Sequence, residues 1–282
     1  MPTQAEKAEA FRALHLGPRT LVLPNAWDVA SARLFENAGF PAVATSSAGV
    51  MVSRGYPDGE GMPRREYLSV VQRIAERLSV PLSADIVSGY GRSVRDVTTT
   101  TEQVIRAGAV GINIEDLRHP HEGLFRLDVQ LKRLAAAKQA ATSTGVPLVI
   151  NARTDAFRHS PGEEPDRLRE AIRRATAYRD AGADCVYPMG VTDANSIATF
   201  VEAVRCPVNV MVREGLPPLA ELERLGVRRV SFGPAASYAA LGLLKRASEE
   251  VLERGSFDLL VHGAISFSEL NELAVPRRPS AP

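Results

Sequence analysis

Short apolar runs rich in valine, isoleucine and leucine alternate along the chain with longer segments whose apolar residues recur every three or four positions. The first pattern predicts buried β-strands and the second predicts amphipathic helices. The eight strand-like runs begin at Leu21, Pro41, Pro81, Gly111, Pro147, Cys185, Pro207 and Arg229. A helical pattern separates most runs from the next, which is the order expected of a parallel sheet.

The junctions between these segments repeat as well. Four helical patterns end at a glycine, within NAGF, RAGA, DAGA and RLGV, where a left-handed helix terminus favours that residue. Eight strands alternating with helices predict a (β/α)8 TIM barrel, with an open doubly wound sheet as the second interpretation. No compositional break divides the chain. We therefore expect one domain over residues 1–282, with a barrel over about 18–255 and an additional C-terminal helical extension over about 256–273.

The amino-acid composition indicates which kinds of binding partner the protein has. Hydrophobic residues make up 45% of the chain, charged residues 24%, and the formal net charge is +1, which favours neither nucleic acid nor an anionic membrane as a partner. No segment has the apolar length of a membrane helix or the pattern of a signal peptide. These features predict a cytoplasmic protein that acts on a small molecule. Cys185 and Cys206 have neither metal-binding nor redox spacing.

Three acids are placed where a TIM barrel carries its active site, at the carboxyl ends of the strands. Asp85 and Glu115 end the third and fourth runs, and Asp58 lies in the long loop after the second. Carboxylate oxygens with few histidines nearby suit a hard cation, Mg²⁺ or Mn²⁺. We predict a metal site at these acids. A single acid at such a position would more often cap a helix or pair with an arginine.

Other strand ends predict a substrate site. Arg153 ends the fifth run, and its planar guanidinium suits a carboxylate or phosphonate, although a salt bridge to Asp155 or Glu115 is the alternative role. Ser46, Ser47 and Ala48 follow the second run and offer hydroxyl and backbone N–H groups to an anion. The same argument adds Asn209, which lies in the seventh run. No lysine ends a strand, which disfavours Schiff-base chemistry.

The loop LRHPHEGLF after the fourth run holds candidate acids and bases. His119, His121 and Glu122 could exchange protons near neutral pH and line a lid over the barrel mouth. A solvated surface loop explains these residues equally well.

Five segments together resemble the phosphoenolpyruvate mutase and isocitrate lyase superfamily over about residues 10–255. They are LPNAWDVASARLFENAGFPAVATSSAG, GYPD, ADIVSGYG, GINIED and NARTDA. The resemblance implies a (β/α)8 barrel, a homodimer or homotetramer that often exchanges a terminal helix, and Mg²⁺ with small 2-oxo or 2-hydroxy carboxylates or phosphonates.

The resemblance also suggests roles by position. Asp85 resembles the direct metal ligand, and Glu115 and Asp58 resemble the acids that hold the metal's waters. Arg153 resembles the substrate arginine, and the segment from Ser46 to Ala48 resembles the carboxylate-binding loop.

Two departures from the superfamily pattern leave the reaction open. Val87 stands where a second acid is common, and LRHPHEGLF lacks the Lys-Cys-Gly-His lid of the isocitrate lyases, which disfavours isocitrate cleavage. We expect a Mg²⁺-dependent lyase or hydrolase that breaks a carbon–carbon bond through an enolate-like intermediate, with Arg153 and Glu115 in the catalytic site. The alternatives are a phosphonomutase or phosphonopyruvate hydrolase, or a non-catalytic carboxylate-binding protein.

Overall fold

The computed structural model describes residues 2–119 and 122–275, and its strands form a closed parallel barrel. The strands are β1 (Leu21–Leu23), β2 (Asn25–Ala26), β3 (Val43–Thr45), β4 (Leu82–Asp85), β5 (Gly111–Glu115), β6 (Val149–Thr154), β7 (Cys185–Pro188), β8 (Asn209–Met211) and β9 (Arg229–Ser231). They form two ladders, in the orders β2-β3-β4-β5-β6-β7 and β1-β9-β8.

Two connections join these ladders into a barrel. β1 and β2 belong to one extended run in which only Pro24 intervenes, and a parallel bridge pairs Val186 of β7 with Val208, which directly precedes β8. The eight predicted runs therefore all form strands, and the predicted TIM-barrel class is confirmed.

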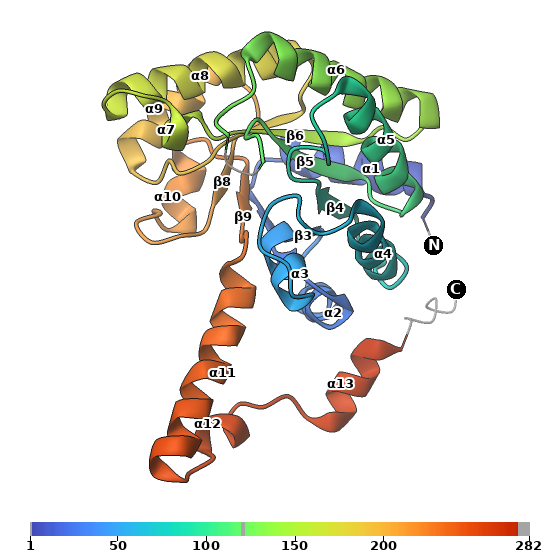
Figure 1. The fold of residues 1–282 in the computed structure, drawn as a ribbon, viewed down its shortest axis with the longest axis vertical. Helices are drawn as coiled ribbons and strands as arrows, with labels where there is room; N and C mark the ends of the chain where they lie inside the picture. Colours follow the sequence, from blue (N-terminus) through green and yellow to red (C-terminus); the bar gives the residue numbers. More distant parts are fainter. Residues whose placement is uncertain (1, 120–121, 276–282) are drawn as a thin grey trace.

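Helices surround the barrel (Figure 1). They are α1 (Gln4–Leu16), α2 (Val29–Asn37), α3 (Ser47–Ser53), α4 (Arg64–Ala75), α5 (Val94–Arg106), α6 (Leu127–Thr144), α7 (Ala156–His159), α8 (Glu164–Asp180), α9 (Ala194–Val204), α10 (Leu219–Arg224), α11 (Ala235–Arg254), α12 (Asp258–Val261) and α13 (Phe267–Ala274). No helix in the described part of the chain is long and apolar enough to cross a membrane.

Local sequence explains where many of these helices begin and end. α2 and α5 begin with capping boxes, in which Asp28 and Ser93 accept hydrogen bonds from the backbone three residues on. The glycines predicted at four helix ends, Gly39, Gly108, Gly182 and Gly226, have φ between 85° and 97°. An L side chain avoids this conformation, so glycine stops each helix before the next strand.

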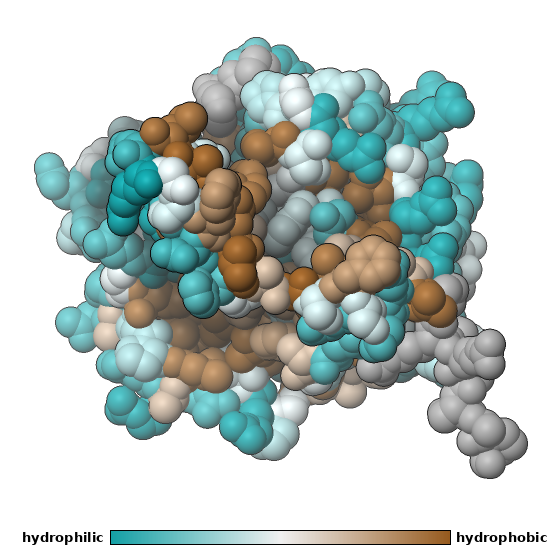
Figure 2. All heavy atoms as spheres, turned by 90° about the horizontal axis from the view of Figure 1, so that it is seen from below, coloured by the Kyte–Doolittle hydropathy of each residue, from teal (hydrophilic) through white to brown (hydrophobic). Residues whose placement is uncertain are grey.

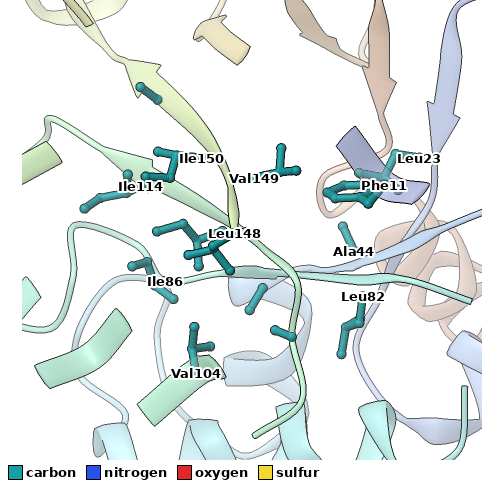
Figure 3. Packing of buried hydrophobic residues seen from close by; sticks show 14 of the residues in the cluster. Phe11, Leu23, Ala44, Leu82, Ile86, Val104, Ile114, Leu148, Val149 and Ile150 are labelled. Carbon is teal, nitrogen blue, oxygen red and sulfur yellow. The ribbon is translucent and has the colours of Figure 1, made fainter. Parts of the chain in front are cut away.

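The hydrophobic core lies between the strands and the surrounding helices, because side chains alternate along each strand. Outward-facing residues such as Leu82, Ile114 and Ile150 are buried against helices, and Figure 3 shows part of this cluster. The inward-facing residues between them are largely polar. This division leaves the barrel interior available for chemistry.

α1 closes the amino-terminal end of the barrel. Phe11 of α1 is fully buried, and a Cβ built on Gly111 would lie only 2.6 Å from its ring. The glycine at the start of β5 therefore makes room for Phe11. Figure 3 shows Phe11 beside Leu23 of β1.

The C-terminal arm differs from the expectation based on the sequence. The sequence places α11 on the barrel as its eighth helix, with the extension starting near residue 256, but α11 points away from the barrel in Figure 1. Only Ser237, Ala247 and Glu250 of α11 are buried. The extension thus starts inside α11, because apolar residues lie on faces that a single barrel surface cannot cover. α13 returns toward α2, and Arg77 donates a hydrogen bond to the carbonyl of Ala274.

Candidate active site

A cavity of about 620 Å³ opens at the carboxyl ends of the strands and extends into the barrel. The sequence-predicted residues that line it are Ser46, Ser47, Ala48, Asp58, Asp85, Glu115, His119, Arg153 and Asn209. Glu122 does not line it, and His121 lies outside the described residues.

Asp85 is held at the end of β4 by hydrogen bonds to its side chain and to its backbone. Its carboxylate accepts from Ser47 Oγ at 2.9 Å, from Asn113 Nδ2 at 3.0 Å and from the backbone N–H of Val87 at 3.2 Å. The backbone carbonyl of Asp85 accepts a hydrogen bond of 2.6 Å from the buried Tyr67 hydroxyl. No lysine or arginine among the described residues forms an ion pair with Asp85. Its charge is therefore fixed in place and available to a cation.

Asp58 approaches Asp85 from the loop after α3. Ser47 Oγ lies 3.5 Å from Asp58 Oδ1 and also bonds Asp85, so one hydroxyl lies between the two acids. Burial and the nearby charge of Asp85 raise the pKa of Asp58. A cation placed between the two carboxylates would relieve this repulsion.

Glu115 and Arg153 form a buried charge cluster on neighbouring strands. Glu115 Oε2 lies 2.7 Å from Arg153 Nη1, and Asp155 accepts two hydrogen bonds of 2.7 Å from Arg153 Nε and Nη2. The alternative role of Arg153, a salt bridge within the barrel mouth, is thus present. Three of the five N–H groups of the guanidinium are used in this way, and two are left for a substrate carboxylate.

His119 connects the loop after β5 to this cluster. Its Nε2 lies 2.5 Å from Glu115 Oε1. Burial raises the pKa of Glu115 to about 7, although Arg153 and His119 oppose this effect. Burial disfavours charge on His119, but the hydrogen bond to Glu115 and its charge outweigh this and raise the pKa of His119. The pair therefore holds a proton at the barrel mouth near neutral pH.

Part of the predicted lid folds back on itself. Leu117 and Leu124 form an antiparallel bridge, and Leu117 and His119 at the start of the loop line the cavity. Glu122 points away, since its carboxylate lies 2.7 Å from the guanidinium of the exposed Arg92. Of these two loop residues, His119 lines the cavity and Glu122 does not.

Ser46 and Asn209 occupy different depths of the cavity. Ser46 Oγ accepts a hydrogen bond of 3.2 Å from the backbone N–H of Gly49 and caps α3. Asn209 Nδ2 donates to Ser231 Oγ at 3.1 Å, from a position deeper in the barrel.

Asn113 was not among the predicted site residues, although it bonds Asp85 directly. Asn151 Nδ2 donates to Asn113 Oδ1 at 2.9 Å, and Asn113 Nδ2 in turn donates to Asp85. These two amides form a relay that orients the carboxylate from below. The signal in the sequence was a polar residue at an inward position of the apolar run GINIE.

The donor set fits a magnesium ion that keeps most of its waters. No group of three or more His, Cys, Asp or Glu side chains within residues 2–119 and 122–275 is arranged to hold a metal on its own. Mg²⁺ in proteins commonly uses one or two carboxylates and several waters, however, and Asp85 and Asp58 supply two. Both oxygens of Glu115 are already bonded to Arg153 and His119.

A barrel with acids and a guanidinium at the carboxyl ends of its strands defines a TIM-barrel enzyme with a site for anionic ligands. Residues 11–252 match the phosphoenolpyruvate phosphomutase family model. The chain belongs to this family, and its relatives are lyases of the phosphoenolpyruvate mutase and isocitrate lyase superfamily.

Two relatives illustrate the similarity. 2-Methylisocitrate lyase of Escherichia coli is 31% identical over 254 residues, which cover 86% of this chain and 82% of that protein. Oxaloacetate decarboxylase of Chromohalobacter salexigens is 29% identical over 250 residues, which cover 85% and 83%.

Solved structures agree with the fold. A Burkholderia cenocepacia protein, assigned only provisionally as a lyase or mutase, superposes with a TM-score of 0.90 at 40% identity, over 97% of both chains. Phosphonopyruvate hydrolase in complex with oxalate and Mg²⁺ has a TM-score of 0.83 at 28% identity, over 95% of this chain and 94% of the other.

Proposed function

We propose that this chain is a Mg²⁺-dependent lyase or hydrolase that breaks a carbon–carbon bond in a small 2-oxo or 2-hydroxy carboxylate. The observation that carries the proposal is Asp85, a carboxylate held by Ser47, Asn113 and the Val87 backbone without a cationic partner among the described residues. The named relatives act on ligands of this class, as 2-methylisocitrate lyase and oxaloacetate decarboxylase.

In this mechanism Asp85 and Asp58 would hold the metal, and Glu115 orients Arg153 and His119. Mg²⁺ or Mn²⁺ bound there would supply positive charge that stabilises negative charge on the substrate. Arg153 binds the substrate carboxylate with its two remaining N–H groups, and Ser46, Ser47 and Ala48 line the same end of the cavity. These contacts fix the substrate before the bond breaks.

The proton for the departing carbon comes from His119 in this proposal. In a 2-oxo acid the bonding electron pair forms an enolate, whose carbon then takes up a proton. In a 2-hydroxy acid the hydroxyl gives its proton to the Glu115–His119 pair and becomes a carbonyl, while the bonding electron pair stays on the departing carbon, which takes up the proton. His119 lies at the cavity and shares a proton with Glu115. His119 also lies in the loop after β5, the predicted lid. In this proposal closure of the lid over the cavity excludes water.

Turnover in the presence of Mg²⁺ tests the proposal. Wild-type protein, Asp85→Asn and the surface control Asp180→Asn are incubated with oxaloacetate, malate, 2-methylisocitrate or phosphonopyruvate, and 2-oxo acid products are measured. We expect one of the carbon-chain acids to be cleaved by the wild type and the control, and at least a hundredfold less by Asp85→Asn. Equal rates in all three proteins would refute the role of Asp85.

A second candidate is carbon–phosphorus chemistry in the same cavity, as a phosphonomutase or phosphonopyruvate hydrolase. The lid without cysteine favours it, because cleavage of a carbon–phosphorus bond requires no cysteine to protonate a carbanion. Release of phosphate from phosphonopyruvate would identify a hydrolase, and its conversion to phosphoenolpyruvate would identify a mutase. Either result, with no cleavage of the carbon-chain acids, would select carbon–phosphorus chemistry.

We further propose that the protein is a homodimer or homotetramer in which the arm of α11 to α13 packs on another copy. Leu244, Leu252 and Phe267 are exposed on this arm, with Leu252 at 87% and Phe267 at 84%. Figure 2, which views the molecule along the arm, shows apolar patches around a hollow on this face. Apolar side chains exposed to this degree commonly mark a protein interface.

A further inference from the structure

A second group of polar side chains lies deeper in the barrel than the acids of the candidate active site. Ser83, Asn151, Asn209 and Arg229 line the same cavity, and each is at most 2% exposed. We call these four residues the lower chamber. The catalytic proposal assigns none of its chemical steps to them.

Strand geometry places the lower chamber beneath the acids. Ser83 stands two residues before Asp85 on β4, and Asn151 two residues before Arg153 on β6. Inward-facing positions recur every second residue, so this step leads about 6–7 Å down the strand. Asn209 and Arg229 face each other in the register of β8 and β9. TIM barrels usually fill this depth with bulky apolar side chains.

Each residue of the lower chamber has a polar atom without a partner in the described part of the chain. These atoms are Ser83 Oγ, Asn151 Oδ1, Asn209 Oδ1 and Arg229 Nε. Burial of a polar atom without a hydrogen-bond partner is unfavourable, and proteins seldom leave several such atoms together. Their concentration around one cavity indicates a ligand or water that bonds them.

Arg229 carries a charge that nothing in direct contact balances. Its Nη1 lies 3.4 Å from His15 Nε2, and its guanidinium lies 6.0 Å from the centre of the Phe11 ring. No carboxylate of the described residues lies within ion-pair distance. Three other buried arginines in the described chain differ in this respect. Arg33 pairs with Glu36, although its Nε has no partner, Arg174 pairs with Asp116, and Arg133 donates to several backbone carbonyls.

Three titratable groups next to Arg229 are neutral. Burial lowers the pKa of Arg229, and the carboxylate whose charge opposes this effect is Asp85 of the upper site. Burial lowers the pKa of His15 to about 3, so the imidazole is uncharged near pH 7. Burial raises the pKa of Cys185 to about 12, which keeps its thiol protonated. Burial likewise raises the pKa of the Tyr187 hydroxyl. A buried charge without a counterion is unfavourable by several kcal/mol.

We propose that the lower chamber binds a small monovalent anion, either a halide or a carboxylate group, against Arg229. Arg229 Nε and the Ser83 hydroxyl donate hydrogen bonds to it, and water links it to the side-chain oxygens of Asn151 and Asn209. One negative charge is enough to neutralise the guanidinium. The proposal does not depend on the catalytic activity of the upper site.

The anion enters through the active-site cavity, because the opposite end of the barrel is closed. Phe11 and His15 of α1 are buried at that end, and Gly111 leaves no space beside the Phe11 ring. Two sources of the anion therefore remain, a free ion or the second carboxylate of a substrate bound above.

Bromide provides a direct test on the wild-type protein. Crystals grown in bromide without Mg²⁺ are expected to show an anomalous difference peak within hydrogen-bond distance of Arg229 Nε, and crystals of Arg229→Gln are expected to lack it. The absence of a peak beside Arg229 in wild-type crystals at molar bromide would overturn the proposal.

Thermal melting tests the same site in solution at pH 7.5. Chloride, bromide and formate are varied at constant ionic strength, with the bulky sulfonate anion of HEPES as the balancing anion because it is too large for the chamber and carries no carboxylate. At ten times the dissociation constant, the ratio of folded to unfolded protein rises about elevenfold. We expect this response in the wild type and its loss in Arg229→Gln.

Two further variants keep the melting test informative. Arg228→Gln is the matched control, since the neighbouring Arg228 bonds the carbonyls of Gly17 and Pro18 and should leave the anion response intact. Asn209→Leu fills the chamber while Arg229 remains, and should abolish the response even if Arg229→Gln fails to fold. An equal response in the wild type and Asn209→Leu contradicts the proposal.

Malate and oxalate distinguish the two sources of the anion. Loss of the bromide peak with malate, but not with the shorter oxalate, would assign the chamber to the distal carboxylate of a substrate. A bromide peak that persists with both acids would assign it to a free ion. Each result supports an anion at Arg229.

Discussion

Val87 holds a backbone conformation that β-branched residues avoid. Its φ is 55°, and its side chain is only 2% exposed. The backbone of Val87 donates to the Asp85 carboxylate and accepts a hydrogen bond of 2.9 Å from the N–H of Glu115. The backbone of Val87 thus links β4, which carries Asp85, to β5, which carries Glu115. Its conformation costs about 1–3 kcal/mol of strain.

Val87→Asn should destabilise the protein by about 1 kcal/mol less than Val97→Asn does, because both changes bury an amide but only position 87 has a positive φ, which asparagine tolerates better than valine. Chemical denaturation measures this change. The control is Val97→Asn, which places the same residue at a fully buried helical valine and should destabilise the fold. Similar losses in both variants would argue against strain at Val87.

His15 gives the protein a predictable sensitivity to acid. Its folded-state pKa, near 3, lies below the usual value of 6.5, so the unfolded chain takes up a proton that the folded chain excludes. Below about pH 6.5, stability should therefore fall by about 1.4 kcal/mol per pH unit from this group.

Denaturation at several pH values checks the effect of His15. His15→Gln retains an oxygen that can accept a hydrogen bond from Arg229, and should reduce the slope between pH 4 and 6. His262→Gln, at the exposed end of α12, should leave the slope unchanged. A slope that His15→Gln does not alter would exclude His15 as its source.

At the scale of single residues, the acids at the strand ends could be predicted from the sequence. The apolar runs show where the strands end, and a TIM barrel brings these ends together. The cavity brings together Asp85, Asp58, Glu115, Arg153 and the Ser46 segment. Their catalytic and metal-binding roles stay predictions. Asn113 and Arg229 were missed, since an inward-facing polar residue is defined only once the register of the barrel is known. Glu122 is directed elsewhere by Arg92, a residue distant in sequence.

At the scale of elements, α1 and β5 depend on one close contact. A methyl group on Gly111 would approach the Phe11 ring to 2.6 Å and Ser83 Oγ to 3.1 Å. Gly111→Ala should therefore destabilise the protein by about 1–3 kcal/mol, as overpacked cores do.

Phe11→Leu supplies the double-mutant test of this contact. The smaller side chain should make Gly111→Ala less costly than it is in the wild-type background, and unfolding free energies of the four proteins measure the difference. Gly17→Ala is the control, because the nearest atom to its added Cβ lies 3.7 Å away. Additive losses in the double mutant would argue against steric conflict.

Strands and helices were predictable because the two periodicities differ clearly along this chain. The four helix ends at glycine were predictable because the positive φ there is a local requirement that favours glycine. The course of α11 was not predictable. The sequence pattern of an amphipathic helix is the same whether its apolar side packs on the barrel or on another chain.

At the scale of the whole molecule, the exposed arm predicts association. Leu252→Glu combined with Leu244→Glu should weaken self-association at least tenfold, since burial of each leucine contributes about 1.5–3 kcal/mol. Sedimentation velocity over a range of concentrations measures it. Leu16→Glu, at an exposed leucine of α1, is the control and should not alter the mass. A wild type that sediments as a single chain at all concentrations would contradict the proposed oligomer.

The barrel wall has its fewest paired positions between β7 and β8, which are joined by the single bridge between Val186 and Val208. Elsewhere in the described chain, neighbouring strands share two or more paired positions, whereas β7 and β8 meet at this one bridge. Few hydrogen bonds need to break for the wall to part there, so the barrel should open by local fluctuation along β7 and β8 before it unfolds globally. Amide hydrogen exchange would then be faster at Val208 and its neighbours than at the other strands of the barrel.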